Sequence, residues 1–222
     1  MQIYTFKLNK TSISLKKLYK RLIFSNNIYI FVIYKDKQER NNPQNNDMTT
    51  LLLVRHGETV DNVRQIMQGQ TQGKLTPNGI EQARALAAEL KDTPIDVFVS
   101  SDLKRAFDTC VILAAAHGVA PDAIVQTKLL RERDWGSFTG RYIPDLKDAV
   151  WTDDIESLDA LRARAASFLQ FVRENYDGKT VLAVGHGIMN KAIRSVHSGT
   201  PMNETPRMAN AEVVRLEVIS NS

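Results

Sequence analysis

The sequence has little cysteine and no long apolar run, and each shortage excludes a class of protein. Because Cys110 is the one cysteine among 222 residues, an internal disulfide cannot form. A disulfide framework is thereby excluded, and we predict a cytoplasmic protein in a reducing compartment. The apolar stretch 22–34 is interrupted by Ser25 and Asn26, is too short to span a bilayer, and lacks a small-residue cleavage site. Neither a transmembrane helix nor a signal peptide is expected.

Net positive charge is confined to the N-terminal region. The net charge is +4, but residues 1–47 alone hold nine Lys or Arg against three Asp or Glu. The rest of the chain has 20 basic and 22 acidic side chains, which is a net charge of −2. Proteins that bind nucleic acid carry a marked basic patch, so we expect no nucleic-acid partner for this part of the chain.

Residues 1–47 also differ from the rest in composition. They contain neither Gly nor Ala, and they end in the polar run Asn41–Asp47, which is typical of a linker. We predict that they form a basic N-terminal extension outside the fold, added by an upstream start, and that one domain of residues 48–222 begins at Met48. A membrane-surface role for the extension stays open. Otherwise no membrane partner is expected.

From Met48 onward, short apolar segments alternate with segments of helical periodicity. This alternation predicts an α/β protein, a three-layer α/β/α sandwich around a mostly parallel sheet. Strands are predicted at 50–54, 96–100, 181–184 and 213–219, with a weaker one at 124–127, and helices at 77–90, 101–117, 157–176 and after Gly187. The last strand alternates only in part, as an edge strand does.

Chemically informative segments lie where predicted strands end. Arg55–Glu58 follows the first strand, Ser101–Arg105 the second, and Gly185–Gly187 the strand at 181–184. Ligands of open α/β sheets bind beyond the carboxyl ends of the strands, so we expect the two histidines and two arginines of these segments to converge. The glycine beside each histidine allows close backbone approach and exposes amides that suit an anion.

These residue types suit the transfer of a phosphoryl group. Arginine forks match its negatively charged oxygens, and such transfer depends mainly on positioning and electrostatic stabilisation. A neutral imidazole can attack phosphorus, while a carboxylic acid protonates the leaving alkoxide. Glu132, within Leu129–Gly136, is the best candidate for that acid, although spacing alone does not select it. Its neighbours Arg131 and Arg133 are expected to be solvated.

The segment Arg55–Asn62 resembles the signature of the histidine phosphatase superfamily, the phosphoglycerate mutase-like proteins. The likeness runs from about residue 50 to about residue 218 and keeps the family's order. It includes Leu75–Gly79, Ser100–Thr109, Leu130–Glu132 with Trp135-Gly136, and Val184–Gly187. Four ordered segments make the resemblance far more specific than one short motif.

This resemblance implies a phosphoglycerate mutase-like fold and a role for each matched residue. His56 would be the nucleophile that becomes phosphohistidine, and Glu132 the proton donor. The remaining predicted catalytic residues would bind the phosphoryl oxygens: Arg55, Arg105 and His186. The residues expected near the bound ester are Asn62, Gln68, Gly69 and Gly187. Neither a metal nor a cofactor is implied, in keeping with the lack of close-spaced His, Asp and Glu sets.

Two departures from the family pattern bear on the function. Thr139 stands where many members have Glu, so we expect a contact near the site to differ. The stretch from Gly140 to Ser157 is shorter than the basic insertion of true mutases, and this favours hydrolysis. A mutase must keep phosphohistidine away from water until the product is rephosphorylated. We therefore predict a phosphatase for a small phosphorylated metabolite, such as a sugar phosphate or a phosphoglycerate-like compound, with segments 65–74 and 141–156 as the walls that recognise the alcohol.

Two alternatives remain: a cofactor-dependent phosphoglycerate mutase, and a catalytically silent binding protein of the same fold. The silent protein is disfavoured because every catalytic residue type is present. A homodimer is left open as a partner.

Overall fold

The computed structural model describes residues 48–219, and the predicted extension at 1–47 lies outside these described residues. Five strands form one sheet in the order β3-β2-β4-β1-β5. The strands are β1 (Thr49–Arg55), β2 (Val97–Ser101), β3 (Val125–Thr127), β4 (Thr180–Gly185) and β5 (Val213–Val218). Four strands run parallel, while β5 pairs antiparallel with β1 at the edge. The predicted mostly parallel sheet with an atypical last strand is thus confirmed.

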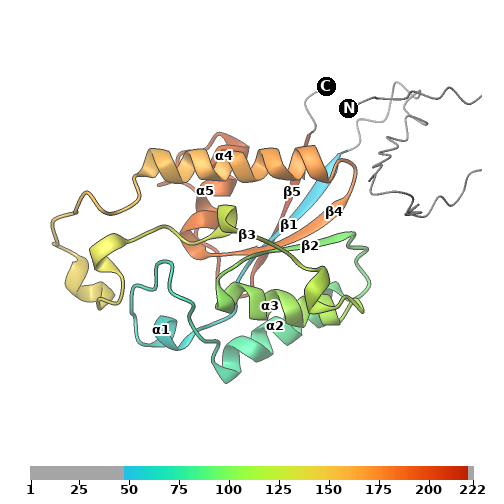
Figure 1. Ribbon diagram of the computed structural model, residues 1–222, viewed down its shortest axis with the longest axis horizontal. Coiled ribbons are helices and arrows are strands. Elements are labelled where there is room, and N and C mark those ends of the chain that lie inside the picture. The colour runs from blue at the N-terminus through green and yellow to red at the C-terminus, as the bar shows by residue number, and fades with distance from the viewer. Residues whose placement is uncertain (1–47, 220–222) are drawn as a thin grey trace, which may run out of the picture. The chain divides into compact units, whose positions relative to one another are not determined.

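The helices lie between the strands, as the alternating pattern predicts. They are α1 (Val60–Val63), α2 (Pro77–Leu90), α3 (Lys104–Ala115), α4 (Leu158–Asn175) and α5 (Gly187–Ser198). Figure 1 shows α4 and α5 over one face of the sheet and α2 and α3 over the other. Four short 3-10 turns occupy Pro121–Ala123, Lys128–Leu130, Gly136–Phe138 and Ile143–Leu146.

One predicted helix boundary is wrong, and one short helix was not predicted. The helix expected at 101–117 begins only at Lys104, because Ser101 still belongs to β2 and its hydroxyl accepts a hydrogen bond from the backbone N–H of Leu103 at 3.2 Å. The unpredicted α1 forms after Thr59, which exchanges capping hydrogen bonds with Asn62. Its single turn is too short to show a hydrophobic period.

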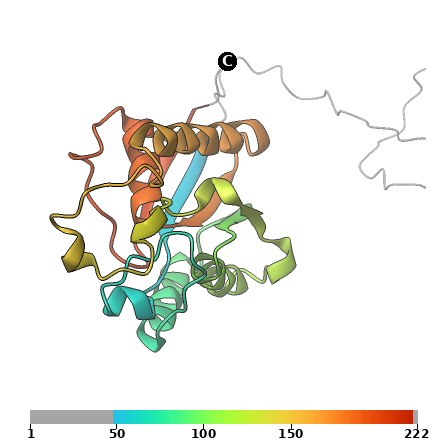
Figure 2. The same ribbon diagram turned by 60° about the vertical axis from the view of Figure 1, so that its left-hand side comes forward.

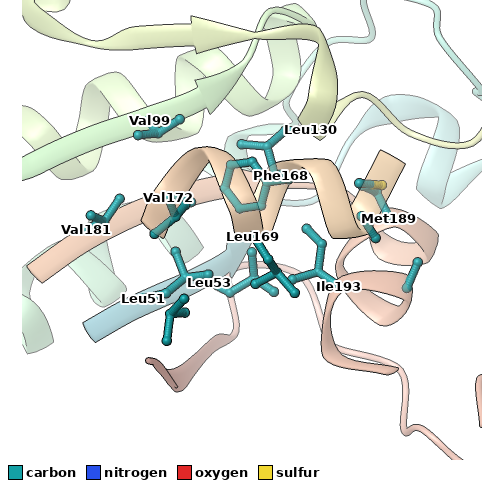
Figure 3. Close-up of a cluster of buried hydrophobic side chains, with 14 of the residues drawn as sticks. Leu51, Leu53, Val99, Leu130, Phe168, Leu169, Val172, Val181, Met189 and Ile193 are labelled. Atoms are coloured by element: carbon teal, nitrogen blue, oxygen red, sulfur yellow. The ribbon is translucent and has the colours of Figure 1, made fainter. Parts of the chain in front are cut away.

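The alternation of side chains along the central strands creates the three layers. Leu51 and Leu53 of β1 pack in a core shared with α4 and α5, part of which is drawn in Figure 3. Leu52 and Val54 point the opposite way, into the core beneath α2 and α3. Successive side chains of a strand point to opposite faces, so a continuous apolar run is buried only when both faces are covered.

Cys110 lies in the second core, on α3. Its side chain is fully buried, and burial raises the pKa of the thiol to about 12. It is therefore an inert core residue, in agreement with its position in an apolar helix. Within residues 48–219, no helix is both long and apolar enough to cross a membrane.

The segments that carry the candidate residues meet at one end of the sheet. The turned view in Figure 2 shows α1 and the loops after β1 and β3 close to the chain that leads into β5. A backbone hydrogen bond from Ala211 to the carbonyl oxygen of Arg55, at 3.0 Å, ties this chain to the end of β1. The fold thus gathers four separate stretches of sequence around the carboxyl ends of the parallel strands.

Replacing Phe168 by Ala tests the core beneath α4. Phe168 is fully buried against both β1 and α5, so the change should lower the free energy of unfolding by about 3–5 kcal/mol. Leu158→Ala, on the same helix but half exposed, should cost less than about 0.5 kcal/mol. Urea unfolding followed by circular dichroism measures both, and equal losses would contradict the placement of this core.

Candidate active site

The candidate site lies at the carboxyl ends of β1 and β4. Their register pairs Arg55 with Gly185, so the residues that follow, His56 and His186, lie side by side with ring centroids 5.2 Å apart. From here the chain leads to α2 on one face of the sheet and into α5 on the other, as Figure 1 shows. Diverging connections of this kind open the crevice in which ligands of α/β sheets bind.

Gly57 and Glu58 anchor the end of β1 against α2. A Cβ atom on Gly57 would lie 2.4 Å from the carbonyl oxygen of Gly79, so only glycine permits this approach. The hydroxyl of Thr76 donates to the Glu58 carboxylate at 2.7 Å, and the same hydroxyl accepts from the N–H of Gly79 to cap α2. These two residues of the motif are therefore structural, and they fix the backbone beside His56.

His56 is held as a neutral imidazole with one unprotonated ring nitrogen. Its Nδ1 lies 2.7 Å from the carbonyl oxygen of Gly57 and must donate the hydrogen bond, because a carbonyl only accepts. Nε2 then has no proton and accepts from Nε of Arg105 at 3.3 Å. Burial, followed by the charge of Arg105, holds the pKa of His56 well below its ordinary value. The nitrogen that Arg105 contacts is thus the unprotonated one, which is the nitrogen able to act as a nucleophile.

Arg105 reaches the site from the first turn of α3 and is almost fully buried. Its guanidinium donates to the carbonyl oxygens of Thr71 and, at 2.8 Å, Gly69, as well as to His56. Burial lowers its pKa to about 10, against the opposing effect of Glu132, so it remains a cation at neutral pH. A cation oriented by carbonyl oxygens keeps its charge available for an anionic ligand.

Arg55 and His186, beside His56, carry buried nitrogen atoms that have no hydrogen-bond partner among the described residues. Arg55 donates through Nη1 to the carbonyl oxygen of Met208 at 2.6 Å, but its buried Nε has no partner. Neither ring nitrogen of the fully buried His186 makes a hydrogen bond within residues 48–219. Burial, then the charge of Arg105, lowers the pKa of His186 well below its ordinary value. Buried polar groups without partners are rare, and they mark this spot as adapted to a ligand.

Glu132 faces the histidines from the segment that follows Lys128–Leu130. One carboxylate oxygen accepts from the backbone N–H groups of Arg133 (2.8 Å) and Met189 (3.1 Å), and the other from Ile188 (3.2 Å). The first turn of α5 thus fixes the side-chain position of Glu132. Gly187 lies beside both groups: a Cβ there would be in ordinary van der Waals contact with Nε of Arg55 (3.5 Å) and Oε2 of Glu132 (3.8 Å).

A cavity of about 240 Å³ joins most of the residues that the sequence singles out. Eight of the nine line it: Arg55, His56, Asn62, Gln68, Gly69, Arg105, Glu132 and Gly187. The ninth, His186, is buried beside His56 and is not part of the wall. Segment 65–74 supplies a wall as expected, whereas segment 141–156 contributes Ile143 alone.

Several wall and support residues were missed by the sequence analysis. Asn210 donates to the carbonyl oxygen of His56 at 3.0 Å and contacts the side chain of Asn62 at 3.3 Å. The wall residues not anticipated are Trp135, Ile188, Arg207 and Met208. Trp135 belongs to one of the matched family motifs and Ile188 directly follows another, although neither was assigned to the site. The chain at 207–210 has no sequence pattern that marks it, because it reaches the site only through the antiparallel addition of β5.

The expectation that both Arg131 and Arg133 are solvated is wrong for Arg133, whereas the side chain of Arg131 is partly exposed. Arg131 forms a bidentate ion pair with Asp102, at 2.5 and 2.7 Å, and this hydrogen bonding raises its pKa. Arg133 is only 5% exposed and lies over the rings of Trp135 and Trp151, at 4.7 and 5.0 Å. Both side chains therefore hold the segment that carries the carboxylate, Arg131 from a partly exposed position and Arg133 from a buried one. Among the described residues, no group of three His, Cys, Asp or Glu could hold a metal ion.

Comparison with known proteins agrees with this geometry. The sequence model of the histidine phosphatase superfamily (branch 1) matches residues 51–222. The chain belongs to the histidine phosphatase superfamily. The expected phosphoglycerate mutase-like fold and the expected phosphomonoesterase class are thereby confirmed.

Three similar proteins illustrate the range of this superfamily. The uncharacterized phosphatase PhoE of Bacillus subtilis (strain 168) is 33% identical over 175 residues, covering 77% of this chain and 89% of that protein. The probable phosphoglycerate mutase GpmB of Escherichia coli (strain K12 / DH10B) is 31% identical over 186 residues, covering 77% and 85%. The structure of a mycobacterial glucosyl-3-phosphoglycerate phosphatase superposes with a TM-score of 0.67 at 26% identity, covering 76% and 89%.

Acid should destabilise this histidine phosphatase through His56 and His186. Both stay neutral in the folded state, whereas in the unfolded chain they bind protons near an ordinary pKa of ~6.5. The unfolded state then holds more protons, so these groups leave stability unchanged above that pH and reduce it below. For each histidine the slope should rise toward a limit of about 1.4 kcal/mol per pH unit, which it approaches about one pH unit below that pKa; urea unfolding between about pH 7.5 and pH 5 measures it.

The variant His186→Gln provides the control, because its side chain does not titrate. It should lose about half of this acid sensitivity. A slope equal to that of the wild type would show that His186 is not held neutral.

Proposed function

We propose that this enzyme hydrolyses small phosphate monoesters through a phosphohistidine at Nε2 of His56. The observation that carries the proposal is the unprotonated Nε2, which faces Arg105 inside a cavity that Glu132 also lines. Nucleophile, cationic groups and proton donor are thus present in one place. The alternative of a silent binding protein has no comparable support, since every group that the reaction needs is brought together.

The phosphoryl group would be bound by the donors that surround His56. Nε of Arg105 points toward the nucleophilic nitrogen, and the buried Nε of Arg55 has no acceptor among residues 48–219. His186 would donate a third hydrogen bond from the opposite side. Preorganised donors of this kind stabilise the charge that develops during phosphoryl transfer without reorganising at that moment.

The reaction would proceed in two balanced steps. First, the lone pair of His56 Nε2 attacks phosphorus, the bond to the ester oxygen breaks, and protonated Glu132 gives its proton to the departing alkoxide. Second, Glu132 takes a proton from water, the resulting hydroxide attacks phosphorus, and the bond to nitrogen breaks to regenerate His56. The hydrogen bond from Nδ1 to Gly57 stabilises the positive charge that the ring carries while it is phosphorylated.

The cavity indicates the size and character of the alcohol. Its volume of about 240 Å³ suits a small metabolite, and its outer walls are largely apolar side chains with one exposed arginine. These wall residues are Ile66, Met67, Trp135, Ile143, Ile188, Arg207 and Met208. The glucosyl-3-phosphoglycerate phosphatase among the similar structures supports a sugar phosphate or a phosphoglycerate-like compound as the substrate. Asn62, Gln68 and Gly69 would contact this part of the ester.

The residues that line the cavity also favour hydrolysis over mutase activity. From the stretch 140–157, Ile143 alone lines the cavity, so this stretch contributes no lysine or arginine to hold a second phosphate. A bisphosphorylated ligand would therefore be poorly retained, and phosphohistidine would be left to water. We further propose a cytoplasmic location and no nucleic-acid partner, in view of the single buried Cys110 and the net charge of −2 after residue 47.

Replacing His56 by Ala should reduce phosphate release from sugar phosphates and phosphoglycerates by at least about 1000-fold, as the loss of a covalent nucleophile does elsewhere. His117→Ala, at the far end of α3, should keep wild-type activity. Radiolabelled ester should leave an acid-labile phosphohistidine on the wild type and on His117→Ala but not on His56→Ala. Label at another residue would refute the assignment of the nucleophile.

Measuring phosphate release also distinguishes a phosphatase from a phosphoglycerate mutase. A phosphatase releases one phosphate for each 3-phosphoglycerate consumed, whereas a mutase given a bisphosphoglycerate primer interconverts the 2- and 3-isomers without net release. We expect stoichiometric release, and isomerisation would overturn the proposal in favour of a mutase.

A further inference from the structure

The proton donor proposed above stands on a segment without regular secondary structure. Residues 131–135 lie between two 3-10 turns, so no helical or strand ladder fixes the backbone of Glu132. The first turn of α5 holds its carboxylate. Something else must hold the main chain, because a carboxylate displaced by about 1 Å from a leaving group loses much of its effect.

Arg164 of α4 holds the main chain on the N-terminal side of this segment. Its Nη1 donates to the carbonyl oxygens of Leu129 (3.1 Å) and Arg131 (2.5 Å), and its Nη2 reaches that of Glu132 at 3.4 Å. Three carbonyl oxygens within four residues thus converge on one guanidinium. Arginine suits this task because its rigid fork presents five donors.

Glu156 holds the other side of the segment and pairs with the same arginine. Its carboxylate accepts from Arg164 at 2.7 and 3.0 Å and from the N–H of Asp134 at 3.1 Å. Its main chain exchanges two further hydrogen bonds, donating to the carbonyl oxygen of Asp134 (3.0 Å) and accepting from Nε of Arg133 (2.8 Å). The Arg164–Glu156 ion pair therefore forms hydrogen bonds with the main chain on both sides of Glu132.

The pair has a rigid base and is shielded from water. The side chains of Arg164 and Glu156 are only 17% and 14% exposed, so the interaction is screened less than a surface pair. On α4, Arg164 lies three residues after Leu161 and directly before Ala165. Both of these neighbours are fully buried in the core under the helix. Its guanidinium is therefore carried by the helix that packs against α5, which begins directly after His186.

We propose that Arg164 and Glu156 are positioning residues that set Glu132 for proton donation. This inference rests on the proposed function, in which Glu132 protonates the leaving group. Neither residue lines the cavity, so each acts through the main chain of the donor rather than by touching the ester.

The leaving group of the substrate provides the test. An alkyl ester such as β-glycerol phosphate needs a proton on its departing oxygen, whereas 2,4-dinitrophenyl phosphate expels a stable phenolate without one. The ratio kcat/KM includes only steps up to alcohol release, so hydrolysis of phosphohistidine does not enter. For Arg164→Met, kcat/KM should fall about 30-fold on the alkyl ester and less than about threefold on the dinitrophenyl ester.

Two further variants sharpen the comparison. Arg162→Met, an exposed arginine on the same helix, should match the wild type on both esters. Adding Arg164→Met to Glu132→Gln should cause no further loss on the alkyl ester, because the group that it positions is already gone. If Arg164→Met does not fold, Arg164→Lys carries the test, since lysine keeps the charge but cannot reach all five acceptors.

The outcomes separate this inference from the proposed function. Equal losses on both esters in Arg164→Met, with a selective loss in Glu132→Gln, would show that the ion pair is merely structural and overturn the inference alone. A Glu132→Gln variant without selectivity would overturn the assignment of the proton donor and, with it, the role of the pair. We expect Arg164→Met and Glu132→Gln each to lose kcat/KM mainly on the alkyl ester, and the double variant to lose no more than Glu132→Gln alone.

Discussion

The burial of positive charge beside two neutral histidines is the constraint on which the site depends. Arg105 is almost fully buried, and the partners of its guanidinium are carbonyl oxygens and His56 rather than a carboxylate. Taking a cation out of water is costly unless its donors are satisfied and its charge is used. The loop after α1 supplies those carbonyl oxygens, so its conformation and the guanidinium position are determined together.

The same constraint prepares His56 for the role of nucleophile that we propose for it. Nearby cations and burial keep the imidazole neutral, while Gly57 fixes the proton on Nδ1. A nucleophile prepared in this way needs no separate base to deprotonate it. Glu132 completes the arrangement from the other wall of the cavity, where the first turn of α5 and the Arg164–Glu156 ion pair hold it from two directions.

Much of the fold follows from local sequence. The apolar run at 50–54 has buried side chains on both faces, and Thr76 with the proline after it begins α2 where the pattern predicts. The helix α3 starts later than its periodicity predicts, because Ser101 still pairs with Thr127 of β3 and its hydroxyl then accepts from the N–H of Leu103. The one-turn α1 is also absent from the periodic pattern, since capping rather than an apolar stripe forms it.

The sequence by itself determined the chemistry of the site. His56, Arg105 and Glu132 belong to motifs whose residue types suit phosphoryl transfer, and strand ends place two of them at one edge of a parallel sheet. Only the tertiary structure decided what surrounds them: Asn210 and Met208 on the chain before β5, the contact of Arg133 with the rings of Trp135 and Trp151, and the hydrogen bonds of Arg164 to the segment that carries Glu132. Motifs record which groups react, whereas these supports come from residues far apart in the chain, whose contacts form only when the sheet and its helices pack.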